Sequence, residues 1–165
     1  MRNRNRYGGI LILLCLMGAL LFCSACAPKE KIFTKSGMSI TLTDAFTEGK
    51  FYSMTAYYES EDNTVSAIRE PFSVLEENGV STDLTLEEYA KTFIEDNEIG
   101  SEVFTEDGLT YFTYEKTIDD VCYLYFETVF RSEDSYWLFQ FTCPKDAYGE
   151  MKTEFVKWAK SVRFS

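Results

Sequence analysis

The chain has 165 residues, of which 45% are hydrophobic and 16% aromatic, and this composition excludes an intrinsically disordered protein because it can supply a core. Its 27 acidic and 16 basic side chains leave a net charge of −11, which makes nucleic acid and anionic lipid headgroups poor partners. The sequence contains no His, so Ser-His-Asp and Cys-His nucleophile pairs are excluded and the commonest metal ligand is missing.

Residues 1–25 have the composition of a secretory signal peptide. Three arginines within the first six residues precede an apolar run at residues 10–22, and the small residues Ser24 and Ala25 come directly before Cys26. We therefore expect this segment to direct export and then to be removed, which leaves the rest of the chain outside the cytoplasm.

The end of this segment, Cys23-Ser24-Ala25-Cys26, resembles the lipobox of bacterial lipoproteins, although Cys23 stands where that pattern usually has Leu. The resemblance implies that the Cys26 thiol receives a diacylglyceryl group and that Cys26 becomes the lipid-anchored first residue at the extracytoplasmic face of the cell membrane. The alternative is an uncleaved anchor, because residues 7–27 are nearly free of polar side chains and about long enough to cross a bilayer.

Residues 26–36 are predicted to be a tether. Pro28 and the charged residues that follow it favour a short solvated segment that holds the domain off the lipid surface. The folded domain is therefore expected to cover residues 37–165.

The first part of this domain predicts strands. Residues 37–42 alternate between apolar and polar side chains, and residues 51–58 and 65–69 are rich in aromatic and β-branched residues on either side of a polar turn. Residues 72–77 predict a short helical turn that ends at an Asn-Gly pair.

Two amphipathic helices are predicted. Thr85 and Glu88 form a capping box, and the apolar residues that follow at helical spacing continue until about residue 97. The last helix begins near Pro144 or Asp146. Its predicted buried side consists of Tyr148, Met151, Phe155, Trp158, Ala159 and Val162.

Residues 109–143 predict a three-stranded antiparallel meander with polar turns at residues 117–120 and 132–135. On one face, the expected register pairs Phe130 with Trp137, Thr128 with Phe139, Phe126 with Phe141 and Leu124 with Cys143. The other face carries Phe112, Tyr114, Tyr123, Tyr125, Val129, Tyr136 and Leu138, interrupted by Glu127 and Gln140. Both faces are too apolar to stay in water. We therefore expect an α+β fold, an α/β/α sandwich with a central antiparallel sheet and helices on both faces.

Four aromatic residues of the meander form a predicted cross-strand patch: Phe112, Tyr114, Tyr123 and Tyr125. Exposed, this patch could face a partner and bind a glycan, a peptide or an apolar ligand by stacking. The other interpretation is that one of the two helices covers it.

The two cysteines of the meander, Cys122 and Cys143, are predicted to be diagonal neighbours on one face, roughly 7–8 Å apart by Cα and too far for a disulfide. We expect two buried free thiols, although an oxidising compartment favours a disulfide.

Few residues are candidates for chemistry. The sequence has no Gly-rich phosphate loop, and Asp119-Asp120 is interpreted as a solvated turn rather than a cation site, so no metal or cofactor is predicted. The carboxylates that fall within or at the ends of strands are Glu127, Glu115 and Glu70, and if any residue is catalytic, it is expected among these three.

The order of the elements resembles a known family. An opening GMSITL strand, a TLEEYAKTF helix at residues 85–93, an aromatic meander and a final helix closing in KSVRF are similar to the PsbP-like (Mog/PsbP-like) α/β/α sandwich proteins. Bacterial members are often lipoproteins. The resemblance implies this fold and a non-enzymatic, partner-facing role, and it supplies no catalytic residue.

The expected function is therefore a membrane-anchored, extracytoplasmic domain with a non-catalytic binding or accessory role in the cell envelope. Its partners are the membrane, through Cys26, and an unidentified envelope protein or ligand. The alternative is a carboxylate-based or metal-assisted hydrolase of envelope polymers, which would place paired carboxylates about 5–9 Å apart in a pocket.

Overall fold

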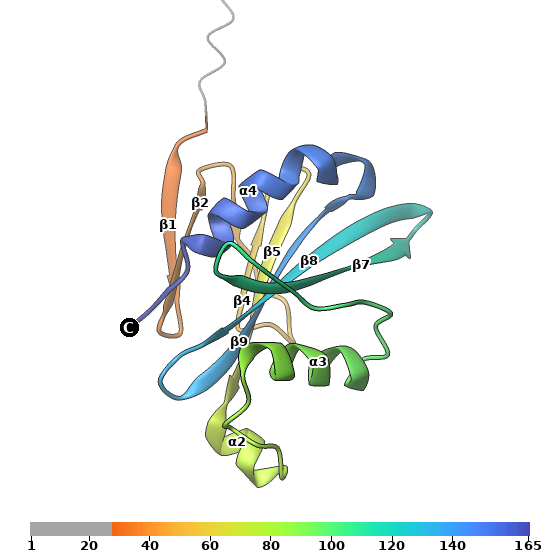
Figure 1. Cartoon of the computed structure of the whole chain (residues 1–165). Helices are drawn as coiled ribbons and strands as arrows, with labels where there is room; N and C mark the ends of the chain where they lie inside the picture. The colour runs from red at the N-terminus through yellow and green to blue at the C-terminus, as the bar shows by residue number, and fades with distance from the viewer. Residues whose placement is uncertain (1–27) are drawn as a thin grey trace, which may run out of the picture.

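The computed structural model describes residues 28–165, which form two antiparallel sheets and three α-helices (Figure 1). The strands are β1 (Glu30–Lys35), β2 (Met38–Thr43), β3 (Thr47–Glu48), β4 (Ala56–Glu59), β5 (Thr64–Pro71), β6 (Phe104–Glu106), β7 (Leu109–Ile118), β8 (Val121–Arg131), β9 (Ser135–Pro144) and β10 (Arg163–Phe164). The helices are α2 (Phe72–Glu77), α3 (Leu86–Asp96) and α4 (Tyr148–Lys160), with a 3₁₀ turn, η1 (Lys145–Ala147), before α4. The α+β class and the antiparallel sheet are thereby confirmed.

The larger sheet has the strand order β3-β4-β5-β9-β8-β7-β6. The meander prediction is confirmed, because β8 and β9 pair in the expected register, with Phe126 opposite Phe141. The turn between β7 and β8 is shorter than expected, since the strands pair up to Ile118 and Val121. Asp119 and Asp120 alone make the turn, both with positive φ, as a two-residue hairpin of right-handed twist requires.

The face of the sheet that carries Phe126 and Phe141, here called the α4 face, packs against α4. Phe155 of this helix is fully buried, and its ring lies 5.7 Å from that of Phe141 between centroids. Trp158 contacts the same cluster. The prediction for the inner side of the last helix is therefore confirmed, and burying these rings supplies much of the stability of the domain.

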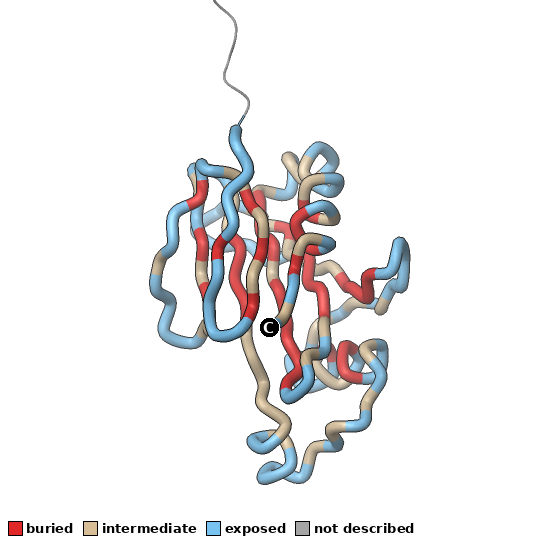
Figure 2. Tube along the Cα trace, turned by 90° about the vertical axis from the view of Figure 1, so that its left-hand side faces the viewer, coloured by how far each residue is buried: buried red, intermediate tan, exposed pale blue. Residues whose placement is uncertain are grey.

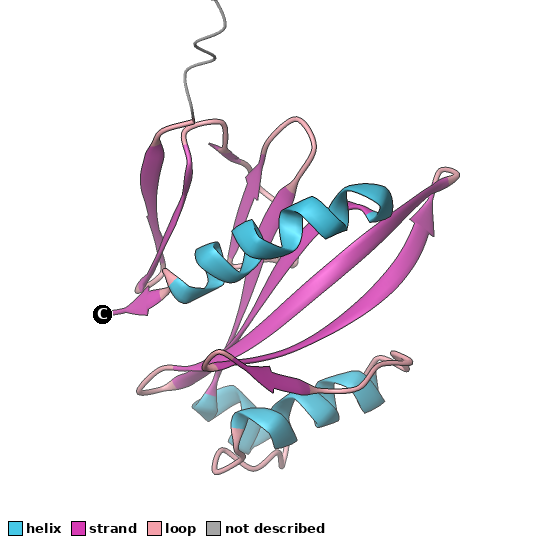
Figure 3. Ribbon diagram, turned by 45° about the horizontal axis from the view of Figure 1, so that its top comes forward, coloured by secondary structure: helices cyan, strands magenta, loops and turns pink. Residues whose placement is uncertain are grey.

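The opposite face, here called the α3 face, carries Phe112, Val129 and Leu138. The buried residues of α3 pack on these strand residues, and they are Tyr89, Ala90 and Ile94. In Figure 3, α4 lies above the strands while α2 and α3 lie below them. Figure 2 shows that the buried residues are concentrated along the central strands.

The capping box of α3 is confirmed. The Glu88 amide donates to Thr85 Oγ1 at 3.2 Å, and the Thr85 amide donates to Glu88 Oε2 at 2.9 Å. The helix ends after Asp96, and Glu98 adopts a left-handed φ of 53°, which turns the chain back across the sheet. The cap and this reversal fix where the segment after α3 lies.

The prediction that residues 26–36 are a tether is wrong for β1. This strand pairs with β2 along its whole length, and Ser36 and Gly37, both with positive φ, form the two-residue turn. Phe33 is buried, with its ring 4.7 Å from that of Tyr58. The charged residues of β1 are exposed, and a strand with a polar outer face has the composition of a linker. The domain therefore begins before residue 37.

The strand predicted at residues 51–58 is also corrected, because only Ala56–Glu59 is a strand. The residues before it form a loop between β3 and β4, in which Phe51 and Tyr52 are exposed. Aromatic residues favour strands only where the pleated surface is covered, and here no neighbouring described strand pairs with them. The loop instead borders the candidate site.

Candidate functional site

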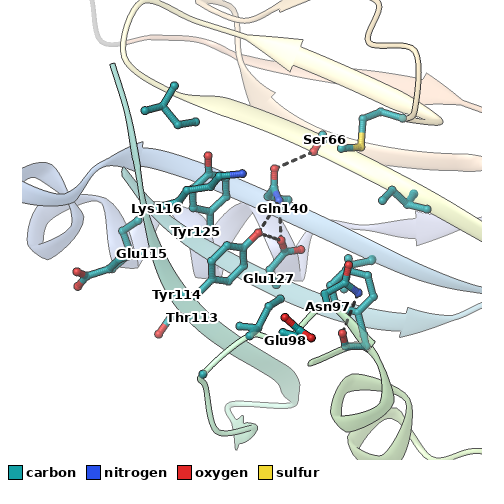
Figure 4. Close-up of a pocket in the computed structure, with 18 of the residues that line it drawn as sticks. Ser66, Asn97, Glu98, Thr113, Tyr114, Glu115, Lys116, Tyr125, Glu127 and Gln140 are labelled. Atoms are coloured by element: carbon teal, nitrogen blue, oxygen red, sulfur yellow. Dashed lines mark hydrogen bonds between the residues drawn. The ribbon is translucent and has the colours of Figure 1, made fainter. Parts of the chain in front are cut away.

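A cleft of about 930 Å³ lies on the α3 face of the larger sheet (Figure 4). Its floor consists of residues from β5, β7, β8 and β9. Its sides come from the end of α3 with residues 97–100 and from the loop between β3 and β4. The helix end and the loop meet only in the folded protein, so this concave surface is a product of the tertiary structure.

A polar network lies at the floor of the cleft, centred on Glu127 in β8. Glu127 is only 1% exposed, and its Oε1 accepts hydrogen bonds from Gln140 Nε2 at 2.6 Å and from the Tyr114 hydroxyl at 3.1 Å. Gln140 Nε2 also lies 3.2 Å from the Tyr114 hydroxyl, and Ser66 Oγ donates to Gln140 Oε1 at 3.5 Å. Glu127 Oε2 is buried and has no hydrogen-bond partner among the described residues. Thus Oε1 accepts two hydrogen bonds, whereas Oε2 accepts none from the described residues.

Burial dominates the acid–base behaviour of this network. Removal from water raises the pKa of Glu127 from 4.5 to about 7, although the hydrogen bonds from Gln140 and Tyr114 act in the opposite direction. Burial, followed by the neighbouring Glu127 charge, raises the pKa of Tyr114 as well. Near neutral pH, Glu127 is therefore present in both protonation states, whereas Tyr114 remains a hydrogen-bond donor.

The walls of the cleft are largely apolar. Ile68 and Leu138 lie on the sheet, and Phe93 and Ile99 belong to α3 and the segment after it. Tyr125 stacks on Tyr114 across the strands, with ring centroids 4.8 Å apart and planes within 5°. An apolar cavity with a few convergent polar groups is the usual form of a small-molecule binding site.

The other carboxylates that line the cleft are solvated. Glu115 forms an ion pair with Lys145 at 2.7 Å, and the side chains of both are about half exposed. Glu98 is exposed on the segment after α3. Glu127 is therefore the one desolvated carboxylate among the described residues that line this cleft.

The aromatic patch predicted from the sequence is divided by the structure. Tyr114 and Tyr125 line the cleft, as the ligand-facing interpretation requires. Phe112 is fully buried beneath α3, with its ring 6.0 Å from Phe93, so for this residue the interpretation that a helix covers the patch is confirmed and Phe112 does not face a partner. Tyr123 is half-buried and lies outside the cleft lining. Cys26, the predicted lipidation site, lies outside the described residues.

The three candidate carboxylates do not meet. Glu127 forms the floor and Glu115 the rim, while Glu70 accepts a hydrogen bond from the Tyr89 hydroxyl at 2.7 Å and does not line the cleft. Sequence reasoning missed Ser66 in this site and treated Gln140 only as an interruption of the apolar face. The signal for Gln140 was available, because the predicted register places it directly opposite Glu127.

The two cysteines of the meander are free thiols. Cys143 is buried, as predicted, and lies opposite Leu124. Cys122 is half-exposed, with its Sγ 3.9 Å from Glu115, so its predicted burial is wrong. It lies where β8 runs past the covered part of the sheet.

Residues 28–165 lack two features that would indicate other kinds of site. No three Cys, Asp or Glu side chains within this range gather as potential metal ligands. None of the helices in the same range combines the length and the apolar character needed to cross a membrane.

Comparison with known proteins identifies the fold. No family model and no curated protein matches the sequence. The solution structure of cyanobacterial PsbP (CyanoP) from Synechocystis sp. PCC 6803 superposes with a TM-score of 0.56, at 16% identity, over 90% of this chain and 100% of that one. A crystal structure from Bacteroides thetaiotaomicron VPI-5482 gives a TM-score of 0.53 at 10% identity over 84% of this chain, which spans 48% of that protein. The chain therefore has a PsbP-like fold, as its element order suggested. At these identities the likeness concerns the fold alone.

Proposed function

We propose that this protein is a lipid-anchored module at the extracytoplasmic face of the cell membrane, and that it binds a ligand in the Glu127 cleft without transforming it. In this proposal residues 1–25 are a signal peptide and Cys26 carries the lipid. What remains of the tether is short, because β1 begins at Glu30. The domain would therefore lie close to the bilayer. The packing of α3 and α4 on different faces supports describing it as an α/β/α sandwich.

The observation that carries the binding role is the cleft with its single desolvated carboxylate. Hydrolysis by two carboxylates needs an acid and a base or nucleophile about 5–9 Å apart on either side of the scissile bond. Glu115 and Glu98 also line the cleft, but they are exposed, and Glu115 is paired with Lys145. The geometry favours recognition over hydrolysis.

The second candidate is a hydrolase of envelope polymers, and one observation favours it. A general acid that works near neutral pH needs a raised pKa, and Glu127 has a pKa of about 7 inside a cleft. Glu127 is therefore the residue on which the two candidates make different predictions.

We expect neither the wild-type protein nor Glu127→Gln to release soluble products from purified peptidoglycan, because Glu127 is the one desolvated carboxylate among the described residues of the cleft and Glu115 is held in an ion pair with Lys145. Reducing sugars and free amino groups are measured over time, with a known muramidase as the positive control. Glu115→Gln serves as the matched variant at the rim. Turnover by the wild type that disappears in Glu127→Gln would establish the hydrolase instead, and its loss in Glu115→Gln as well would identify Glu115 as the second carboxylate.

A further inference from the structure

The two oxygens of Glu127 indicate which kind of group the cleft is suited to receive. Oε1 already accepts two hydrogen bonds, whereas Oε2 is buried and accepts none from the described residues. A buried carboxylate oxygen without a donor is destabilising and requires a physical explanation, and in a binding cleft a ligand that donates to it supplies one. In the ionised form, which dominates above pH 7, the group that matches Oε2 is therefore a hydrogen-bond donor.

The neighbours of Glu127 indicate that this donor carries a positive charge. Gln140 and Tyr114 both direct donors at Glu127, which favours its ionised form, yet neither brings a compensating charge. A buried carboxylate is best balanced by a cation in direct contact. The other polar groups near it are Ser66 and Tyr125 in the cleft and Tyr89 on α3, all of them uncharged at neutral pH.

Lys116 is the one basic residue that lines the cleft. Glu127 pairs with Phe112, and Lys116 follows four residues later on the same strand, so the Cα atoms of residues 112 and 116 are roughly 13 Å apart. In Figure 4 the Lys116 side chain extends over Tyr125, but Lys116 is exposed, so water and salt screen its charge. The pKa of Glu127 is set by its burial and by the hydrogen bonds from Gln140 and Tyr114.

The walls determine the rest of the ligand. Phe93, Ile99 and Leu138 offer apolar surface, and the stacked rings of Tyr114 and Tyr125 offer π-faces that attract a cation. The cleft volume of about 930 Å³ accommodates a drug-sized molecule or a dipeptide.

Access to Oε2 requires some movement of the cleft. Glu127 is 1% exposed, so a donor that reaches Oε2 has to displace side chains around it. Asn97 and Glu98 line the same cleft where α3 ends (Figure 4). These two residues follow the last turn of the helix, where the chain is exposed.

We propose that the Glu127 cleft binds an organic amine with an aromatic or aliphatic body, whose ammonium group donates to Glu127 Oε2. Its apolar body lies against Leu138, Phe93 and Ile99. This inference rests on the proposed binding function and specifies the ligand class of the same site.

The test compares three probes that differ only in their polar end: 4-phenylbutylamine, 4-phenylbutan-1-ol and 4-phenylbutyrate. Each is titrated at pH 8 into the full chain held in nanodiscs of neutral lipid, and empty nanodiscs measure partitioning. We expect the amine to bind at least tenfold more tightly than either other probe. Glu127→Gln should weaken amine binding at least tenfold, whereas Glu61→Gln, in the exposed turn between β4 and β5 and outside the cleft lining, should leave it unchanged.

A second readout does not depend on the folding of a variant. The amine stays protonated between pH 6 and pH 8, but Glu127, with a pKa of about 7, becomes ionised across this range. Affinity of the wild type for the amine should therefore fall about tenfold from pH 8 to pH 6. Equal affinity for amine and alcohol, or an amine affinity that is independent of pH and of Glu127, overturns the inference. If the alcohol or the acid binds more tightly than the amine and this binding depends on Glu127, the amine inference is wrong but the proposed binding function holds. Turnover of peptidoglycan would contradict the binding function itself.

Discussion

Between pH 4.5 and pH 7, the unfolding free energy of the wild-type protein is expected to fall by about 3 kcal/mol because Glu127 ionises, and Glu127→Gln is expected to lack this decrease. The side chain is 1% exposed, and burial is the largest cause of its raised pKa. Gln has nearly the same shape and keeps an oxygen that can accept from Gln140 and Tyr114. The substitution therefore removes the titration and retains most of the packing.

The direction follows from the protons bound in each state. In the unfolded chain Glu127 ionises near pH 4.5, whereas in the folded protein it keeps its proton until about pH 7. Stability is thus highest below pH 4.5, falls as the pH rises through this window, and loses nothing more from this group above pH 7. A difference of this size in pKa corresponds to about 3 kcal/mol, at about 1.4 kcal/mol per unit.

Urea unfolding at several pH values between 4.5 and 8 measures this effect, with fluorescence of the buried Trp137 and Trp158 as the signal. The quantity to compare is the change of unfolding free energy with pH, because the amide group that the substitution introduces adds a constant offset of its own. Other groups, such as Asp134, whose pKa is lowered chiefly by its hydrogen bond from Ser135, contribute equally to both proteins. Parallel curves for wild type and Glu127→Gln would mean that Glu127 is not desolvated. Glu115→Gln is the exposed control and should follow the wild type.

Replacing Cys26 by Ala is expected to abolish acylation and either to release the protein from the membrane fraction or to leave it misprocessed, with residues 1–25 still attached. A diacylglyceryl group supplies two acyl chains, and two chains anchor a protein stably where one gives only marginal binding. Ala offers no thiol for this modification. Fractionation of cells, combined with labelling by a clickable fatty acid, measures both the location and the acylation.

Cys23→Leu is the matched control, because it brings the lipobox closer to its usual form while keeping Cys26. This variant should stay acylated and membrane-bound. A wild-type protein without acylation at Cys26, shown by mass spectrometry of its N-terminus, would contradict the lipoprotein interpretation and favour residues 7–27 as an uncleaved anchor.

Residues close in sequence were sufficient to predict the start of α3 and the pairing of β8 with β9. Thr85 and Glu88 predicted the start of α3, and the alternation around Phe126 and Phe141 predicted the register of β8 and β9. Each of these features depends on residues that are close in sequence or directly paired. The strand β1 was missed because its exposed face is charged, as in a linker. Its pairing with β2 and the burial of Phe33 against Tyr58 are tertiary features that its local sequence does not indicate.

The candidate site could be predicted only in part. Glu127 and Gln140 were visible as polar residues on an otherwise apolar face, and their pairing followed from the register. The cleft itself could not be predicted, because it exists only where the end of α3 and the loop before β4 approach the sheet. The same tertiary packing decides that Phe112 is covered while Tyr114 lines the cleft.

The most direct test of the central claim, that a desolvated Glu127 is the recognition group of a binding cleft, is its own titration. Spectra of protein labelled with ¹³C at the Glu carboxyl carbons are recorded across pH, and the Glu127 signal is the one that Glu127→Gln lacks. We expect a midpoint near pH 7, which should fall by about one unit or more when 4-phenylbutylamine saturates the cleft, because the bound cation favours the carboxylate. A midpoint near pH 4.5, or one that the amine leaves unchanged, would contradict this account.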